Sequence, residues 1–436
     1  MLKSGGGATR SPGQNIVFLP GVDVVISHKH FSSPIQFPLV KMVRVYNNWV
    51  MSATGWKTKL HIGLFTLTRI VVSTSFRMVY PFLPVFARGL GVEPTTLAYA
   101  ISIRSFLGVL GPFLATIADT HDRKTGILLG IGLFTVGSGV VGIWPVFWSF
   151  ILGTSLVLLG NVVFIPSVNA YLGDRIPYEQ RGRVMAFLEL NWALAFIIGI
   201  PVVRFLIESY DWVAPFILFS GIGLLFFIIF ALILPAHHIP KTADNNIWKN
   251  LSRLVHTWPA LAGMLVGVLV TSSNETVNLI FGLWIERQFG LNFAALTAAA
   301  VVIGVSELGG EVFTGVFLDI IGKRKTIWIF LGANSLAALL LPLTGNVLGW
   351  AMAGLGFFYI SFEIILVSTL TLMSEVMPNS RATMMAATVA GFSLGRMLGN
   401  LVAPGLFEIS FWATCLAAVV LNLAAAGLLT QVRLKR

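Results

Sequence analysis

Long apolar stretches separated by short polar loops fill the chain from about residue 60 to about residue 430. A helix of about 20 apolar residues is long enough to cross the hydrocarbon of a bilayer. The stretches are continuous and do not alternate at every second residue, so a membrane β-barrel is excluded. We therefore predict an all-α membrane protein with twelve transmembrane helices, at residues 60–86, 95–118, 125–146, 149–172, 184–207, 213–234, 259–282, 294–321, 326–343, 347–373, 383–406 and 409–430.

A polar stretch divides these spans into two groups of six. The first 58 residues contain no apolar run of crossing length, and their opening is too polar for a signal peptide. They are either a dispensable extension or a segment at the lipid surface, where interleaved basic and apolar residues favour binding. The predicted parts are a disordered or interfacial extension, a six-helix bundle, a cytoplasmic linker and a second six-helix bundle, at residues 1–58, 59–234, 235–257 and 258–436.

Two loop motifs recur in both halves at one constant offset. Residues 111–124 read GPFLATIADTHDRK and residues 311–325 read EVFTGVFLDIIGKRK, so Asp119 aligns with Asp319. In a second pair of loops, DRIPYEQR and EVMPNSR, Arg181 aligns with Arg381 at the same offset. Internal duplication of this kind is typical of secondary transporters, whose substrate site lies between the repeats. The pattern predicts two pseudo-symmetric six-helix bundles.

Composition agrees with a membrane location, since 56% of the residues are hydrophobic, 11% are charged and the mean hydropathy is +0.85. Of the lysines and arginines outside the spans, only Arg88 and Arg287 lie in loops on one side of the membrane, and all the others lie on the opposite side. The positive-inside rule therefore places both termini and the linker in the cytoplasm. Because topology explains the net charge of +11, we expect no nucleic-acid partner. The plasma (inner) membrane is the expected location.

Several chemistries have no signal in the sequence. No phosphate-binding glycine loop is present, no His or Cys cluster has metal-ligand spacing, and no nucleophile stands beside a base. The single cysteine, Cys415, excludes a disulfide within a monomer, which is the state we expect. We predict that the protein is not an enzyme and uses no cofactor or metal.

With its twelve spans, its six-plus-six repeat and its aspartate-basic loops, the chain resembles the major facilitator superfamily over about residues 60–430. The second loop copy fits the family pattern well, whereas the first has Ala115, Thr120 and Asp122 where glycine, a basic residue and glycine are expected. The resemblance implies that these loops are parts of a cytoplasmic gate. The predicted gate residues are Asp119, Arg123, Lys124, Asp319, Lys323, Arg324, Asp174, Arg181, Glu375, Arg381 and Glu311.

Two shorter segments resemble the drug and proton antiporter branch of the superfamily. Tyr80-Pro81-Phe82-Leu83-Pro84 is similar to its proline-bearing pattern, and Gly199-Ile200-Pro201 to a fragment of its glycine-proline signature. Proline and glycine also serve bending and close packing in membrane helices. The chain departs from the branch at Leu156, where an arginine usually precedes Gly160. The proton-relay role of that arginine is therefore not transferred.

Charged residues inside the spans carry the strongest indication of mechanism. An unpaired charge at the bilayer centre costs at least about 2.5–3.5 kcal/mol, so these side chains are expected to face a polar cavity or one another. The N-terminal half has four arginines and one glutamate, and the C-terminal half has four glutamates and one arginine. These are Arg69, Arg77, Arg104, Arg204 and Glu189, and Glu275, Glu307, Glu311, Glu363 and Arg396.

Glu307 and Glu363, with Arg396 as their partner, are the predicted residues for proton coupling or recognition of substrate charge. Glu307 and Glu311 are four residues apart and share a helix face. Permanent structural ion pairs are the alternative interpretation. The same role is assigned to Glu275, Arg69, Arg77, Arg104 and Glu189, and the predicted cavity lining is Asn169, Trp192, Asn274 and Tyr359.

The sequence thus predicts a secondary active transporter that works by alternating access. Efflux of a hydrophobic or amphiphilic small molecule, coupled to protons, is the first hypothesis. An importer or lipid flippase of the same fold is the second. A membrane receptor or scaffold without transport is the alternative from another class.

Overall fold

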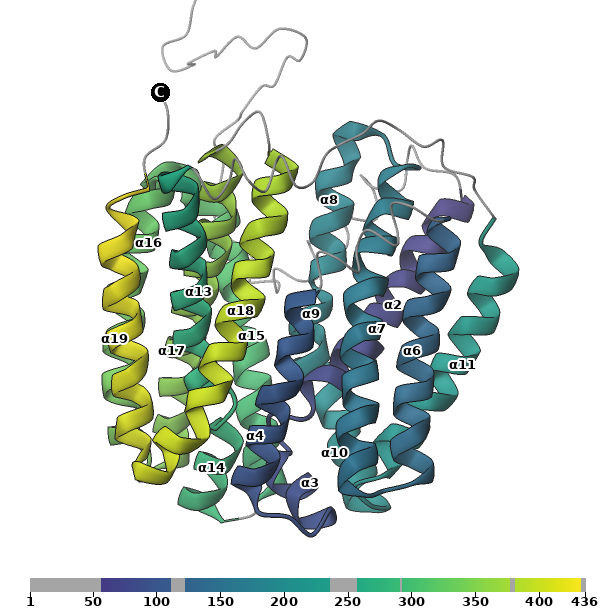
Figure 1. Ribbon diagram of the computed structural model, residues 1–436, viewed down its shortest axis with the longest axis horizontal. Helices are drawn as coiled ribbons and strands as arrows, with labels where there is room; N and C mark the ends of the chain where they lie inside the picture. The colour runs from purple at the N-terminus through teal and green to yellow at the C-terminus, as the bar shows by residue number, and fades with distance from the viewer. Residues whose placement is uncertain (1–55, 111–121, 236–256, 291, 377–380, 433–436) are drawn as a thin grey trace, which may run out of the picture. The chain divides into compact units, whose positions relative to one another are not determined.

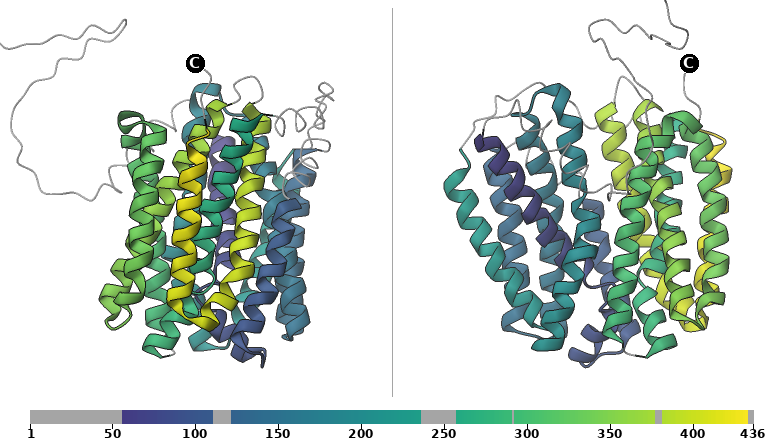
Figure 2. Two further views of the ribbon diagram at one scale, coloured as in Figure 1. Left: turned by 60° about the vertical axis from the view of Figure 1, so that its left-hand side comes forward. Right: turned by 180° about the vertical axis from the view of Figure 1, so that it is seen from behind.

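The computed structural model describes residues 56–110, 122–235, 257–290, 292–376 and 381–432, which all belong to one compact unit, residues 53–436. The predicted extension up to residue 55 and nearly all of the predicted linker lie outside these ranges. Helices make up both halves of the unit, and Figures 1 and 2 show them running in roughly parallel directions.

The N-terminal half contains α2 (Trp56–Arg77), α3 (Leu83–Gly89), α4 (Pro94–Ser105), the 3₁₀ helix η1 (Phe106–Leu110), α6 (Arg123–Ile143), α7 (Phe147–Gly173), α8 (Tyr178–Glu189), α9 (Asn191–Leu194), the π-helix η2 (Ala195–Gly199), α10 (Ile200–Ser209) and α11 (Ala214–Ile233). The C-terminal half contains α13 (Trp258–Asn278), α14 (Phe281–Phe289), α15 (Phe293–Ile321), α16 (Lys323–Leu340), the 3₁₀ helix η3 (Leu341–Thr344), α17 (Leu348–Val376), α18 (Arg381–Ile409) and α19 (Phe411–Leu429).

Helices occupy most of each predicted span within the described residues. Nine of the described helices are long and apolar enough to cross a membrane. The other three spans have simple reasons for falling short. The first is broken and carries two arginines, the second runs into residues outside the described ranges, and the eleventh, α18, has Arg396 in its middle.

The first span is broken at a proline. Because Pro81 has no N–H, it cannot donate to the carbonyl of Arg77, and α2 ends at Arg77. The chain continues through Met78–Phe82 before α3 begins. The seventh span has a break at the corresponding position of the second half, since α13 ends at Asn278 and α14 begins at Phe281. Paired broken helices are the usual position of a transporter binding site.

The two breaks lie against each other across the boundary between the halves. A Cβ atom built on Gly282 would lie 2.6 Å from the carbonyl oxygen of Tyr80 and 2.8 Å from that of Pro81. Only glycine allows the two backbones to come this close. We call this end of the unit, formed by α3, α14 and the start of α4, the Arg88 end. The opposite end, where α16 begins, is the Lys323 end.

Contacts between the halves are concentrated toward the Arg88 end. The described helices that pack across the boundary are α4 and η1 against α18, η2, α9 and α10 against α15, and α3 against α14. One hydrophobic cluster contains residues of both halves, among them Phe82 and Phe281. A second cluster consists of residues of the C-terminal half alone, such as Ile327 and Met384. The halves are therefore joined toward one end of the membrane-spanning body.

The close approach at Gly282 gives a first prediction. Replacing Gly282 with Ala forces backbone to shift, and we expect the free energy of unfolding in detergent to fall by about 1–3 kcal/mol, as overpacking does. Gly332→Ala is the control, because nothing lies within 4 Å of a Cβ atom at that position. That change is expected to leave stability equal or slightly higher, since alanine favours a helix. Equal effects of the two substitutions would contradict the packing described for Gly282.

Candidate functional site

A small polar pocket lies between the halves, beside the two helix breaks. Its volume is about 100 Å³, enough for several water molecules. Aromatic and ionisable side chains from both halves share its wall. The lining residues are Phe76, Arg77, Tyr80, Trp192, Asn274, Glu275, Asn278, Glu307, Glu311, Tyr359, Phe362, Glu363, Leu366 and Arg396.

Arg77 and Glu307 connect the two halves in this pocket. Arg77, the last residue of α2, donates hydrogen bonds to both carboxylate oxygens of Glu307 on α15, one of them at 2.7 Å. A further bond from Arg77 to the backbone oxygen of Trp192 measures 3.0 Å. The guanidinium also lies 3.7 Å from the ring centre of Phe196, which belongs to η2. Both partners of the ion pair are buried, so this is a bidentate bridge in a low-dielectric environment.

Three glutamates lie together on the C-terminal side of this bridge. Glu307 and Glu311 occupy successive turns of α15, and both act electrostatically on Glu363 of α17. Gly310 explains how α17 comes so near, because a Cβ atom there would lie 2.7 Å from Cβ of Glu363. Carboxylates this close cannot all carry charge in a low dielectric without strong repulsion.

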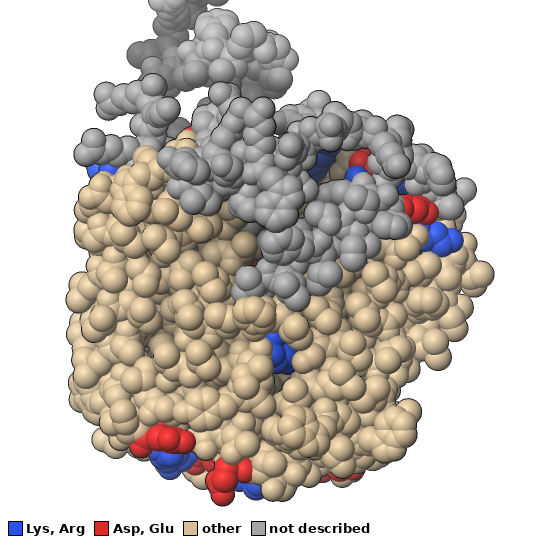
Figure 3. All heavy atoms as spheres, in the orientation of Figure 1, with Lys and Arg blue, Asp and Glu red and all other residues tan. Residues whose placement is uncertain are grey.

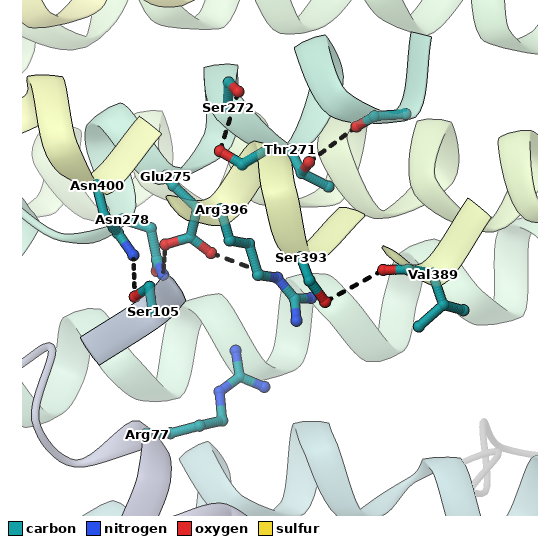
Figure 4. Close-up of polar contacts among 12 residues, drawn as sticks. Arg77, Ser105, Thr271, Ser272, Glu275, Asn278, Val389, Ser393, Arg396 and Asn400 are labelled. Atoms are coloured by element: carbon teal, nitrogen blue, oxygen red, sulfur yellow. Dashed lines mark hydrogen bonds and ion pairs between the residues drawn. The ribbon is translucent and has the colours of Figure 1, made fainter. Parts of the chain in front are cut away.

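Arg396 contacts a different acid from the one expected. Its Nε lies 3.6 Å from Oε1 of Glu275, and Asn278 donates to Oε2 of Glu275 at 2.9 Å (Figure 4). The hydroxyl of Tyr359 in turn donates to Oδ1 of Asn278 at 2.8 Å. We expected Arg396 to be the partner of Glu307 and Glu363. The structure instead pairs it with Glu275 within the C-terminal half, on the wall of the same pocket.

A second ionic cluster lies inside the N-terminal half. Arg69 donates to Glu189 at 2.9 Å and to Asn169 at 3.3 Å. None of these three residues lines the pocket described above, although all three were predicted to act in the central cavity. Arg204 is also outside the pocket and pairs with Glu208 one turn away, at 3.0 Å on a partly exposed face of α10.

The predicted gate residues form equivalent ion pairs in the two halves, near the Lys323 end. Arg123 lies 3.2 Å from Asp174 in the first half. Lys323, which corresponds to Arg123 in the repeat, pairs with Glu375 in the second half. Each pair joins helices of one half and does not cross the boundary. Other predicted members bond to backbone oxygens: Lys124 to Ala231, Arg324 to Thr430 and Arg181 to Ile176. Asp319 is exposed, and Asp119 and the side chain of Arg381 lie outside the described part of the chain.

Sequence reasoning missed several residues of the interface. Arg88 was assigned to topology alone, yet it pairs with Glu286 across the boundary. Tyr80, Phe196 and Asn278 also contribute to the site, as described above. The proline motif next to Tyr80 was a usable signal for that residue. No comparable signal marked Phe196, since apolar aromatic residues occur throughout the spans.

Comparison with known proteins agrees with this architecture. The family model of the Major Facilitator Superfamily matches residues 65–400, most of the chain. The chain belongs to this superfamily. The predicted fold of twelve transmembrane helices in two six-helix bundles is thereby confirmed, and so is the predicted family.

Relatives and solved structures of the superfamily cover nearly the whole chain. An uncharacterized MFS-type transporter of Bacillus subtilis, YwfA, is 26% identical over 86% of this chain and 92% of its own length. Multidrug resistance protein 2 of the same organism is 22% identical over 84% and 94%. Quinolone resistance protein NorA of Staphylococcus aureus is 22% identical over 80% and 90%. The crystal structure of a bacterial homolog to the human lysosomal transporter Spinster, in an inward-facing and unoccupied conformation, matches with a TM-score of 0.65 and 14% identity, covering 87% of this chain and 95% of that one.

The bridge between Arg77 and Glu307 gives a second prediction. Removing one partner leaves a buried charge without compensation, so Arg77→Gln and Glu307→Gln are each expected to lower the free energy of unfolding by about 3–5 kcal/mol. The double variant is expected to cost less than the sum, with a coupling of about 0.5–3 kcal/mol. Denaturant unfolding in micelles measures all four proteins. The same double-mutant cycle on Arg204 and Glu208 is the control. This pair is partly exposed and lies one turn apart on a helix, so its expected coupling free energy is about 0.3–0.5 kcal/mol. Additive effects at Arg77 and Glu307 would contradict the bridge.

Proposed function

We propose that this membrane transporter exports a hydrophobic or amphiphilic small molecule in exchange for protons. The observation that carries the proposal is the acid cluster of Glu307, Glu311 and Glu363, which is tied to the opposite half through Arg77. A titratable group that also holds the two halves together can couple proton binding to a change of conformation.

In this mechanism the ionised Glu307 binds Arg77 and keeps the Arg88 end closed. A proton on Glu307 removes the charge that the guanidinium binds, and the bridge between the halves weakens. Glu311 and Glu363 lie beside Glu307 in the same pocket, and like charges gathered in a low dielectric repel one another. The pair of Arg88 and Glu286 is then the remaining ion pair between the halves among the described residues.

The orientation of the protein in the membrane is inferred from the distribution of its basic residues. We infer that the Lys323 end, with its basic residues, faces the cytoplasm of a cell whose plasma (inner) membrane holds the protein. The described conformation is then inward-facing, since the halves are joined toward the Arg88 end. The paired contacts of Arg123 with Asp174 and of Lys323 with Glu375 act as the cytoplasmic gate when the halves close there.

Several features support a hydrophobic or amphiphilic substrate. Phe76, Trp192 and Tyr359 place aromatic rings on the wall of a pocket that also contains acids. Two relatives are named for multidrug resistance and quinolone resistance. An importer or lipid flippase of the same fold is the second candidate, favoured by Leu156, which stands where drug antiporters carry an arginine.

Flux measurements test the proposal. Purified protein in liposomes is expected to move fluorescent amphiphilic dyes such as ethidium, and an imposed pH gradient is expected to accelerate this flux in the wild type. Glu307→Gln and Glu363→Gln are expected to lose most gradient-driven flux, because an amide cannot take up a proton. Dye exchange without a gradient is expected to persist in both variants.

Glu208→Gln is the matched control, since Glu208 is a partly exposed glutamate of a transmembrane helix outside the pocket. It is expected to behave as the wild type. Full gradient-driven flux in both Glu307→Gln and Glu363→Gln would refute the coupling role of these acids. Gradient-driven uptake in place of export would support an importer.

A further inference from the structure

A second cavity opens sideways on the transmembrane surface, between the two halves. It is a groove of about 430 Å³, within the range of about 300–1,000 Å³ for small-molecule sites. Its walls come from α4, η1 and α7 of one half and from α18 of the other. The lining residues are Ser102, Ile103, Arg104, Phe106, Leu107, Ile151, Ser155, Met397 and Leu401.

The rim of this groove faces the lipid. Ile103, Phe106 and Leu401 are large apolar residues that are 69%, 54% and 47% exposed on membrane-spanning helices. On the face drawn in Figure 3, most of the surface between the two ends is tan, interrupted by a basic side chain near the middle. A molecule that enters the groove sideways therefore comes from the bilayer.

Among the described residues that line the groove, Arg104 is the one that carries a charge. Its side chain is 3% exposed, and none of its three guanidinium nitrogens has a hydrogen-bond partner in the described part of the chain. It lies 5.3 Å from the ring centre of Phe76, a cation–π contact. Glu275 attracts it electrostatically but is already paired with Arg396. A buried guanidinium without hydrogen bonds costs several kcal/mol, so an anion that bonds to Arg104 directly would lower the free energy of this site.

We propose that the groove binds a long-chain carboxylate from the bilayer, with the carboxylate on the guanidinium of Arg104 and the hydrocarbon chain along the apolar walls. A guanidinium matches a carboxylate through two parallel hydrogen bonds. Arg104 lies ten residues into α4, about 15 Å from the start of that helix. A small head group on one chain reaches this depth more readily than the head group of a two-chain phospholipid.

An occupant of the groove contacts both halves of the protein. Asn400 of α18 donates to the hydroxyl of Ser105 at 3.0 Å (Figure 4). Ser102 donates to the backbone oxygen of Asn400 beside the groove. The ligand therefore stabilises the described contact of α4 with α18. The inference goes beyond the proposed function, because it concerns binding and holds whether or not the ligand is then transported.

Photo-cross-linking tests the site directly. The full-length protein in nanodiscs of zwitterionic lipid is exposed to a hexadecanoate with a photoreactive group in its chain, at a pH where the free acid is ionised. Mass spectrometry maps the labelled peptides. Labelling is expected on α4, η1 and α18 at the groove, with competition by hexadecanoate and at least about tenfold weaker competition by its methyl ester.

Variants separate the charge from the cavity. Arg104→Gln is expected to reduce labelling at the groove about tenfold and to remove the preference for acid over ester, whereas Arg104→Lys retains part of it. Leu401→Trp fills the groove and is expected to abolish labelling there even if Arg104→Gln fails to fold. Arg204→Gln, in a transmembrane helix away from the groove, is the matched control and is expected to label as the wild type.

Labelling of the lipid-exposed residues of α11 provides an internal reference and is expected to be the same in every variant. Unchanged groove labelling in folded Arg104→Gln, or in Leu401→Trp, would overturn the proposal. Even labelling of all lipid-exposed helices in the wild type would overturn it as well. None of these labelling results depends on transport flux, so they test the groove independently of the proposed export function.

Discussion

A positive charge inside the membrane needs a negative charge beside it, and Arg77 obtains one from the other half of the molecule. Pro81 ends α2 at this arginine, and the helix end leaves the guanidinium directed at α15, where Glu307 accepts two hydrogen bonds. Neither half can satisfy this pair alone. The contact between the bundles is therefore tied to the ionisation of a single carboxylate.

The duplicated architecture gives this contact its surroundings. Helix breaks at corresponding positions of the two halves meet at Gly282, and the boundary on that side is filled by buried aromatic residues such as Phe82 and Phe281. The ion pairs near the Lys323 end, by contrast, stay within each half. The two halves are thus in contact with each other at the Arg88 end, whereas the ion pairs at the Lys323 end stabilise each half separately. This arrangement suits alternating access, in which one half rocks against the other.

Much of this was predictable, for physical reasons that differ between features. The spans follow from apolar length, and the inward placement of the charges follows from the cost of exposing them to lipid. Pairing was not predictable, because Arg77 and Glu307 meet only after both halves have packed. The ion-pair contact of Arg396 with Glu275 likewise has no signal in the sequence. The break after Asn278 has no proline to announce it, and the approach of Glu363 depends on Gly310, one of many glycines in the chain.

The central claim is that the bridge from Arg77 to Glu307 holds the halves together at the Arg88 end. Spin labels at Trp148→Cys, at the start of α7, and Ile409→Cys, at the end of α18, lie on exposed positions of opposite halves at that end, and Cys415→Ala removes the native cysteine. Electron–electron distance measurements in nanodiscs are expected to give one short population, which shifts to longer distances when Arg77→Gln is added. An unchanged distance distribution in Arg77→Gln would contradict the account.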